Sequence, residues 1–340
     1  MNISKLKQTT KVVVHANCPD GIASAMILKD ALNLAPEQIF FTQHDTPEYN
    51  NILCETGMLF CDCTPPQNRI PEFVAAGTIV LDHHKWSRDV VAAFGENGAF
   101  ADFTTEPEVS GARLAYREVW VPIRQSIIAY TSDGDFIRPL VNKFSHIAGV
   151  RDNWQLQSEY WEQSKEQAAL LIFMPINIWM NQSLGGILTS WDYSLGKILV
   201  EKDMERAVHI AAKRWTYRTD SGMVIAIIPS RFISDASDLL EDECSVVIGF
   251  SYVKNEPGCY PGLLLSLRSF KGSFDCGKFC KTYGGGGHMN SAGCKFETEA
   301  GTLNPYKFIC DKMDEYLCKV DDKIIPDTKS NIFDLLYRSP

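Results

Sequence analysis

Short apolar runs alternate with helical patterns from residue 11 to about residue 135, and this alternation constrains the fold more than any other feature. We expect strands at residues 12–14, 38–42, 58–61 and 78–81, and helices at 23–34, 66–76 and 110–120. Strands that alternate with helices in this way indicate parallel βαβ units. The predicted fold class is α/β, with a Rossmann-like doubly wound, mainly parallel sheet.

The length of 340 residues favours two domains. Residues 192–218 predict one long helix of mixed charge between two βα patterns, which suits a connector. Beyond it, we expect strands at 223–228, 245–253 and 262–267, and helices at 233–241, 275–282 and 305–320. We therefore predict a first domain over 1–190, whose residues 154–188 form a helical cap, a helical linker over 191–220 and a smaller α/β domain over 221–340.

Composition excludes several classes of protein. The net charge of −9 argues against a sequence-independent duplex-DNA binder, which needs a broad basic surface. The 11 cysteines lack zinc-finger spacing, and their odd number favours a reducing compartment. No apolar run approaches the roughly 18 to 20 residues of a membrane span, and the polar first residues do not resemble a signal peptide. We expect a cytoplasmic protein with no membrane partner.

Histidines and aspartates follow the predicted strands. Ligands of a doubly wound sheet bind beyond the carboxyl ends of its strands, so the first polar residues after each strand are the candidates for chemistry. We take the segment 127–130 as a fourth strand end. The residues supplied in this way are His15 and Asp20, then Asp62, then Asp82, His83 and His84, and finally Asp133 and Asp135.

This mixture of ligands predicts a particular metal chemistry. Imidazoles with several carboxylates suit two divalent ions of the Mn²⁺ type better than a structural zinc, which prefers thiolates and imidazoles. A shared aspartate would bridge the ions. Two ions about 3.5 to 4 Å apart activate water and stabilise charge in phosphoester hydrolysis.

Several motifs in order resemble one known family. The segments "HANCPDGIASA", "FCDCTPP", "IVLDHHK" and "TSDGDF" resemble the motifs of the DHH phosphoesterase superfamily, and "SLRSF" with "KTYGGGGHMNSAG" resembles its C-terminal DHHA1 domain. The similarity extends over residues 11–295. The most similar branches are the oligoribonuclease/3′-phosphoadenosine-phosphate phosphatases and the cyclic-dinucleotide or nucleic-acid phosphodiesterases, all of which hydrolyse phosphoesters with divalent metal.

The resemblance implies a role for each residue. Asp62 would bridge the two ions, His84 would contact the scissile phosphate, and Asp82 would orient its neighbours. The remaining ligands would be His15, Asp20, His83 and Asp133.

The first motif departs from the family pattern. The family commonly has two aspartates two residues apart, but this chain has only Asp20. Cys18 or Ile22 stands at the other position, and Asn17, Cys18 or water would complete the site. We therefore expect one weakly held ion. For the fourth motif, Asp135 and Asp152 compete with Asp133.

Four glycines, residues 284–287, precede His288. We expect a helix to start after them, so that backbone N–H groups and the helix N-terminus would hold an anion. The resemblance implies that Gly285, Gly286, His288 and Arg268 bind the phosphate or base end of the substrate.

The resulting hypothesis is a two-domain metal-dependent phosphoesterase acting on nucleotides or short single-stranded oligonucleotides, with a homodimer as the assembly. The acidic net charge favours small substrates over long polymers. The alternatives are a cyclic-dinucleotide phosphodiesterase, a single-strand exonuclease and a non-catalytic nucleotide- or nucleic-acid-binding relative.

Overall fold

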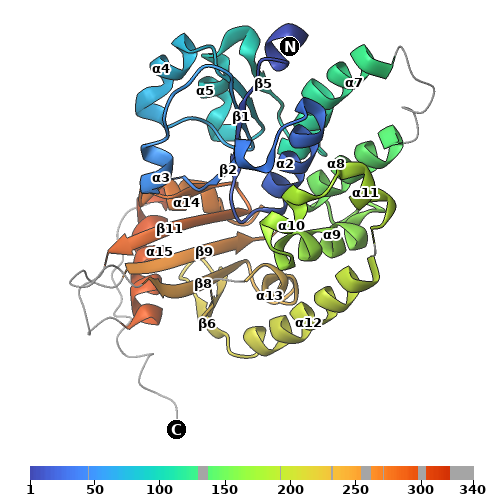
Figure 1. The fold of residues 1–340 in the computed structure, drawn as a ribbon. Coiled ribbons are helices and arrows are strands. Elements are labelled where there is room, and N and C mark those ends of the chain that lie inside the picture. Colours follow the sequence, from blue (N-terminus) through green and yellow to red (C-terminus); the bar gives the residue numbers. More distant parts are fainter. Residues whose placement is uncertain are drawn as a thin grey trace. The chain divides into compact units, whose positions relative to one another are not determined.

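The computed structural model describes residues 1–44, 46–128, 137–191, 193–230, 233–253, 262–270, 272–297 and 304–321. The chain divides into two compact units, Met1–Lys202 and Asp203–Pro340. Figure 1 shows the elements of both in chain order. None of the helices within these described ranges is long and apolar enough to cross a membrane.

The first unit contains a five-stranded sheet whose neighbouring strands are all parallel. The strand order is β2-β1-β3-β4-β5. The strands are β1 (Lys11–His15), β2 (Ile39–Thr42), β3 (Met58–Cys61), β4 (Ile79–Asp82) and β5 (Gly98–Phe100). The chain reverses its direction of winding between β1 and β3, which is where doubly wound sheets bind ligands. This arrangement confirms the predicted fold class and the four predicted strands; β5, only three residues long, was not predicted.

Alternate residues of the strands face two different hydrophobic cores. Val12 and Val14 of β1 belong to a core that includes helix α2 (Pro19–Leu32), whereas Val13 belongs to a second core on the opposite face. This alternation follows from the two-residue period of a strand. Helices therefore cover both faces of the sheet (Figure 1).

The other helices of the first unit are mostly short. They are α1 (Ile3–Leu6), α3 (Pro47–Asn50), α4 (Ile70–Ala75), α5 (Arg88–Ala92), α6 (Gly111–Leu114), a π-helical turn (Ala115–Trp120), α7 (Val121–Ile128), α8 (Ile137–Asp152), α9 (Trp161–Phe173), α10 (Ile176–Asn181) and α11 (Leu184–Thr189), with α12 (Tyr193–Ala211) running past the unit boundary. The prediction of a strand over 127–130 was wrong for Ile127 and Ile128, which belong to α7, and residues 129 and 130 lie outside the described part of the chain. A short apolar run cannot distinguish a strand from the last turn of a helix.

The second unit has a six-stranded mixed sheet in the order β10-β11-β9-β8-β7-β6. Of the neighbouring strands described in this sheet, only β7 and β8 pair in parallel. The strands are β6 (Trp215–Arg218), β7 (Val224–Ile228), β8 (Val246–Val253), β9 (Gly262–Ser269), β10 (Gly286–Gly287) and β11 (Ser291–Glu297), and the helices are α13 (Ser234–Asp238), α14 (Cys276–Thr282) and α15 (Pro305–Asp321).

Two expectations about this region were wrong. The long helix α12 ends at Ala211 rather than at residue 218, because the aromatic and β-branched residues of β6 pair with β7 as a strand. The glycine run does not begin a helix either. Gly286 and Gly287 pair with β11, whose residues Ala292 and Cys294 alternate into the core, so the glycines form one arm of a hairpin.

Candidate metal centre

The carboxyl ends of β1, β3 and β4 bring together His15, Asp62 and His83. Asp62 directly follows β3, and His83 directly follows β4. Because parallel strands end at one edge of the sheet, these residues meet although they are far apart in sequence. His83 Nε2 lies 3.2 Å from Asp62 Oδ1, and His15 Nδ1 lies 3.8 Å from Asp62 Oδ2.

Asp62 joins two groups of potential metal ligands. One group contains His15, Cys18 and Asp62, and within it the ligand atoms lie within 4.8 Å of one another. The other surrounds His83, whose Nε2 lies 3.4 Å from Asp152 Oδ2 and 3.9 Å from Asp20 Oδ2. The two oxygens of Asp62 face different groups, which is the arrangement that a bridging carboxylate requires.

The electrostatics of Asp62 favour a bound cation. Its side chain is 1% exposed, and Oδ2 accepts no hydrogen bond from the described part of the chain. Burial, together with the nearby Asp20 carboxylate, raises the pKa of Asp62 well above its usual range. A buried carboxylate beside another is costly unless a cation compensates the charge. The donor set of carboxylates and imidazoles therefore fits divalent ions.

His15 is available as a neutral ligand. Desolvation and the neighbouring rings of His84 and His44 lower the pKa of His15 to about 4. Its imidazole is consequently uncharged near neutral pH and can offer a nitrogen lone pair to a cation.

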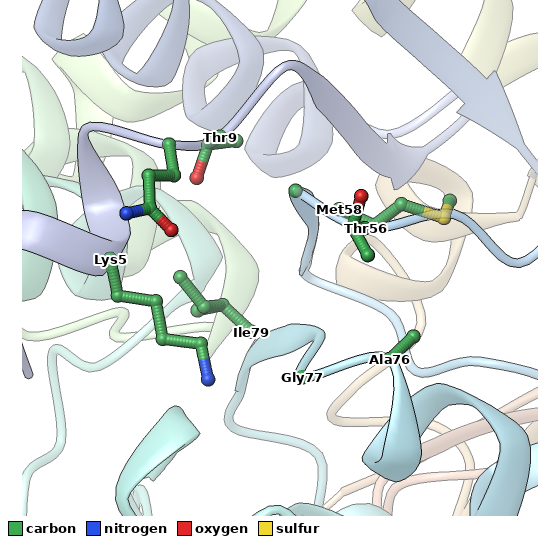
Figure 2. A pocket seen from close by; sticks show the side chains of 9 residues that line it. Lys5, Thr9, Thr56, Met58, Ala76, Gly77 and Ile79 are labelled. Carbon is green, nitrogen blue, oxygen red and sulfur yellow. The ribbon is translucent and has the colours of Figure 1, made fainter.

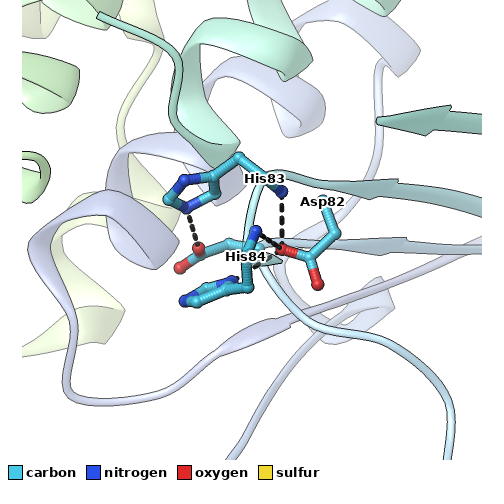
Figure 3. Close-up of side chains that lie close together, drawn as sticks. Asp82, His83 and His84 are labelled. Atoms are coloured by element: carbon cyan, nitrogen blue, oxygen red, sulfur yellow. Dashed lines mark hydrogen bonds and ion pairs between the residues drawn. The ribbon is translucent and has the colours of Figure 1, made fainter. Parts of the chain in front are cut away.

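Asp82 orients His84 (Figure 3). Its Oδ1 lies 2.7 Å from His84 Nδ1 and accepts hydrogen bonds from the backbone N–H groups of His83, at 2.7 Å, and His84, at 3.2 Å. Burial alone would raise the pKa of Asp82, but pairing with His84 holds it below its usual range. Although burial opposes this shift too, Asp82 raises the pKa of His84 above its usual value. The pairing therefore orients the His84 ring and favours its protonated form.

The backbone around Asp62 is unusual. Asp62 has a φ of 61°, a left-handed conformation that non-glycine residues seldom adopt. Its N–H donates a 3.0 Å hydrogen bond to the carbonyl of Leu81 in β4. Such conformations cluster at functional sites, where the surrounding structure enforces them.

Asp20 is held by the start of helix α6. Its carboxylate accepts hydrogen bonds from the N–H groups of Gly111, at 2.6 Å, and Ala112, at 3.0 Å. The approach requires glycine, because a Cβ at Gly111 would lie 2.5 Å from Asp62 Cβ and 2.8 Å from Asp20 Oδ2. We did not predict a role for Gly111. The only signal was its place after Ser110, which caps the helix.

Replacing Gly111 by alanine should therefore displace Asp20 and Asp62 and weaken the binding of divalent ions. We expect a decrease of about 10-fold or more in Mn²⁺ affinity, the size of effect seen when groups that support ligands are lost. Isothermal titration calorimetry measures the change. Gly286→Ala is the matched control, because a Cβ there meets nothing within 4 Å. An unchanged affinity in Gly111→Ala would contradict the prediction.

The structure distinguishes some of the alternatives that the motifs left open. Cys18 Sγ lies in the group with His15 and Asp62, whereas Ile22 is buried in the core, so Cys18 is the one of the two that lies beside the proposed ligands. Desolvation and three nearby carboxylates, Asp62 foremost, raise the pKa of the Cys18 thiol.

The fourth motif is resolved only in part. The predicted Asp133 and its competitor Asp135 lie outside the described residues. Asp152, the third candidate, ends helix α8, and its carboxylate reaches His83. Asp152 is therefore the candidate for this motif whose position beside His83 the structure describes.

The predicted substrate-binding residues of the second unit lie at one end of its sheet. Arg268 in β9 is opposite Ser291 in β11, and the N–H of His288 donates to the carbonyl of Ser291 at 2.7 Å. The Arg268 guanidinium donates to Ser234 Oγ at 3.0 Å. A Cβ at Gly285 would lie 2.2 Å from the Gly293 carbonyl, so close backbone packing explains this glycine without any ligand.

A cavity of about 160 Å³ lies at the opposite edge of the first sheet (Figure 2). Its lining includes Met58 and Ile79, the first residues of β3 and β4, together with Lys5 and Thr9. It is therefore at the amino ends of the strands, away from the metal-ligand groups.

Comparisons with known proteins address the fold. No family model and no curated protein matches the chain. Among solved structures, the DHH domain of a protein described as belonging to a family of ribosomal proteins is similar with a TM-score of 0.50 and 13% identity, over 93% of this chain and 88% of that one. This likeness shows that the chain has the fold of a DHH-domain protein, as its motifs predicted.

Two further structures are more distant. A pGpG-specific phosphodiesterase, PggH, from Vibrio cholerae is 14% identical, with a TM-score of 0.41 over 92% of this chain and 99% of that one. An exopolyphosphatase-related protein from Bacteroides fragilis is also 14% identical, with a TM-score of 0.43 over 94% of this chain and 96% of that one.

Proposed function

We propose that this protein is a metal-dependent phosphoesterase that hydrolyses phosphodiester or terminal phosphate bonds of nucleotides or short oligonucleotides. The observation that carries the proposal is the position of Asp62, whose two oxygens face two separate groups of metal ligands. The motifs of the chain, which resemble those of DHH phosphoesterases, support the same reaction.

The candidate ligands would divide between two cation positions, and Asp62 would belong to both. His15 and Cys18 would hold one ion, and Asp20, His83 and Asp152 would hold the other. When bound, two such ions would supply an activated water and would neutralise the charge that develops on the phosphoryl group. Mn²⁺ suits this mixed set of oxygen and nitrogen donors.

His84 is the side chain that contacts the phosphoryl group in this proposal. Asp82 fixes its Nδ1, and the raised pKa of His84 favours the imidazolium form. In that form Nε2 donates a hydrogen bond to a phosphoryl oxygen or a proton to the leaving oxygen.

The decisive experiment measures product release by metal-free protein to which Mn²⁺ is added back. The substrates are di- and trinucleotides, 3′-phosphoadenosine 5′-phosphate, cyclic dinucleotides, longer single strands and pyrophosphate. We expect Mn²⁺-dependent hydrolysis of the short nucleotides. Hydrolysis restricted to cyclic dinucleotides or long strands would favour one of the alternative enzymes, and nucleotide binding without turnover would favour the non-catalytic relative.

A separate prediction concerns Arg268 and His288. If they bind only the substrate, Arg268→Ala and His288→Ala should each raise KM with kcat and metal content unchanged. Loss of a hydrogen bond to a charged group costs about 1.5–3 kcal/mol, so we expect an increase of roughly 10- to 100-fold. Lys278→Ala is the control, because its side chain is 78% exposed on α14. A loss of bound manganese in either variant would refute this division of roles.

A further inference from the structure

Four side chains with aromatic rings form a series of neighbours that begins at the metal-ligand groups. The ring of His15 lies 6.1 Å from that of His44, measured between centroids. His44 in turn lies 5.2 Å from Trp86, and Trp86 lies 5.8 Å from His84. The rings therefore connect His15, a proposed metal ligand, to His84, the proposed phosphate contact.

Trp86 is the exposed member of this series. It lies in the 3₁₀ turn Lys85–Ser87 directly after the Asp-His-His motif, and 47% of its surface is exposed. The turn is held by Ser87, whose N–H and hydroxyl both donate to the His84 carbonyl at 2.8 Å. The indole is thus positioned close to the reacting groups and remains accessible to a ligand.

His44 supports the indole from one side. The two rings meet edge to face, with an interplanar angle of 84°. Behind His44 lies Tyr49, at 4.8 Å and 70°, which is 5% exposed and donates a hydrogen bond to the Thr64 carbonyl at 3.0 Å. The exposed indole therefore contacts His44, which in turn contacts the buried Tyr49 ring.

We propose that Trp86 is the stacking platform for the nucleobase next to the scissile phosphate. The inference rests on the proposed function and names the side chain that would contact the base of its nucleotide substrate. Aromatic side chains stack on any base because every base has a π-face, so the platform selects for a base without selecting among bases. An inorganic phosphate chain has no planar apolar surface and gains nothing from an exposed indole.

The test pairs each dinucleotide with analogues in which one base is replaced by hydrogen. Trp86→Ala should raise KM for the intact dinucleotide by roughly 5- to 100-fold, the effect of losing one base–aromatic stack. KM for the analogue that lacks the stacked base should be high already and should not change further. Trp86→Phe should recover most of the lost affinity, a result that a purely structural role for the indole does not predict.

Phe173→Ala serves as the control, because Phe173 is 60% exposed on α9. Its kinetic constants should match those of the wild type on every substrate. An equal effect of Trp86→Ala on the intact dinucleotide and on both analogues would overturn the inference.

A failure of the proposed function has a different signature. If the wild type hydrolyses no phosphoester, calorimetry with Mn²⁺ and the same ligands still measures stacking. Removal of one base should then weaken binding to the wild type and leave binding to Trp86→Ala unchanged. Equal weakening in both proteins would overturn the inference independently of catalysis.

Discussion

Replacing Asp62 by asparagine is expected to lower turnover by more than about 100-fold. The loss of a residue that only hydrogen-bonds to a metal ligand already lowers metal affinity or activity by roughly 10- to 100-fold. Asparagine keeps the shape of the side chain but removes the charge and one of the two carboxylate oxygens that face the two ligand groups. Steady-state assays with Mn²⁺ measure the loss. Asp89→Asn, an exposed position on α5, is the control for removing one carboxylate.

The same variant should change the stability of the metal-free protein in a pH-dependent manner. The pKa of Asp62 is raised in the folded state by burial and by Asp20, so the folded protein holds this proton more tightly than the unfolded chain. Stability from this group is therefore present below the unfolded pKa of about 4 and decreases as the pH rises toward the folded pKa.

Asp62→Asn lacks this titration. We expect metal-free Asp62→Asn to gain thermal stability over the wild type as the pH rises above about 4, while the wild type alone regains stability on addition of Mn²⁺. Thermal unfolding at several pH values, with and without Mn²⁺, measures both effects. Activity within a few-fold of the wild type, or equal stabilisation of both proteins by Mn²⁺, would show that Asp62 does not bridge the ions.

Chelation should abolish essentially all activity of the wild type, and added Mn²⁺ should restore it. Cys18 provides a thiol of raised pKa where DHH phosphoesterases commonly have a second aspartate, so an ion held beside His15 would lack one hard, charged ligand. The affinity of hard cations increases with the number of carboxylate ligands. Activity should therefore fall sharply even in mild chelator.

Cys18→Asp should reverse this weakness. We expect the Mn²⁺ concentration for half-maximal activity to fall by about 10-fold, which corresponds to about 1.4 kcal/mol of additional binding free energy. Metal analysis after dialysis measures occupancy directly, and Cys318→Asp adds the same charge at an exposed position on α15. Two fully retained manganese ions in the wild type after exhaustive dialysis against chelator would disprove the weak-site argument and would implicate an additional ligand.

The contribution of tertiary packing is clearest at Asp152, Gly111 and Trp86. Asp152 comes from the end of a helix, and helical periodicity does not reveal where a helix end points. Gly111 contacts Asp20 and Asp62 only because α6 packs beside α2. Trp86 could be placed near His84 by sequence alone, but its exposure and its contact with His44 could not.

The glycine run shows why local pattern was insufficient in the second unit. Glycine permits both an anion-binding turn before a helix and a close hairpin, so four glycines in a row do not distinguish the two. In the structure, β10 pairs with β11, and Ala292 and Cys294 of β11 are buried, so the glycines form a hairpin. These are contacts made by the sheet as a whole.

The sequence by itself determined the parallel sheet and the meeting of His15, Asp62 and His83. Buried strands have a two-residue period or are apolar throughout, and parallel strands end at a common edge, so the residues that follow them converge. Only the tertiary structure decided that Cys18 rather than Ile22 lies beside His15 and Asp62, that Asp152 reaches His83, and that the indole of Trp86 lies beside both His84 and His44. Those outcomes depend on distances between segments remote in sequence, and such distances are set by packing.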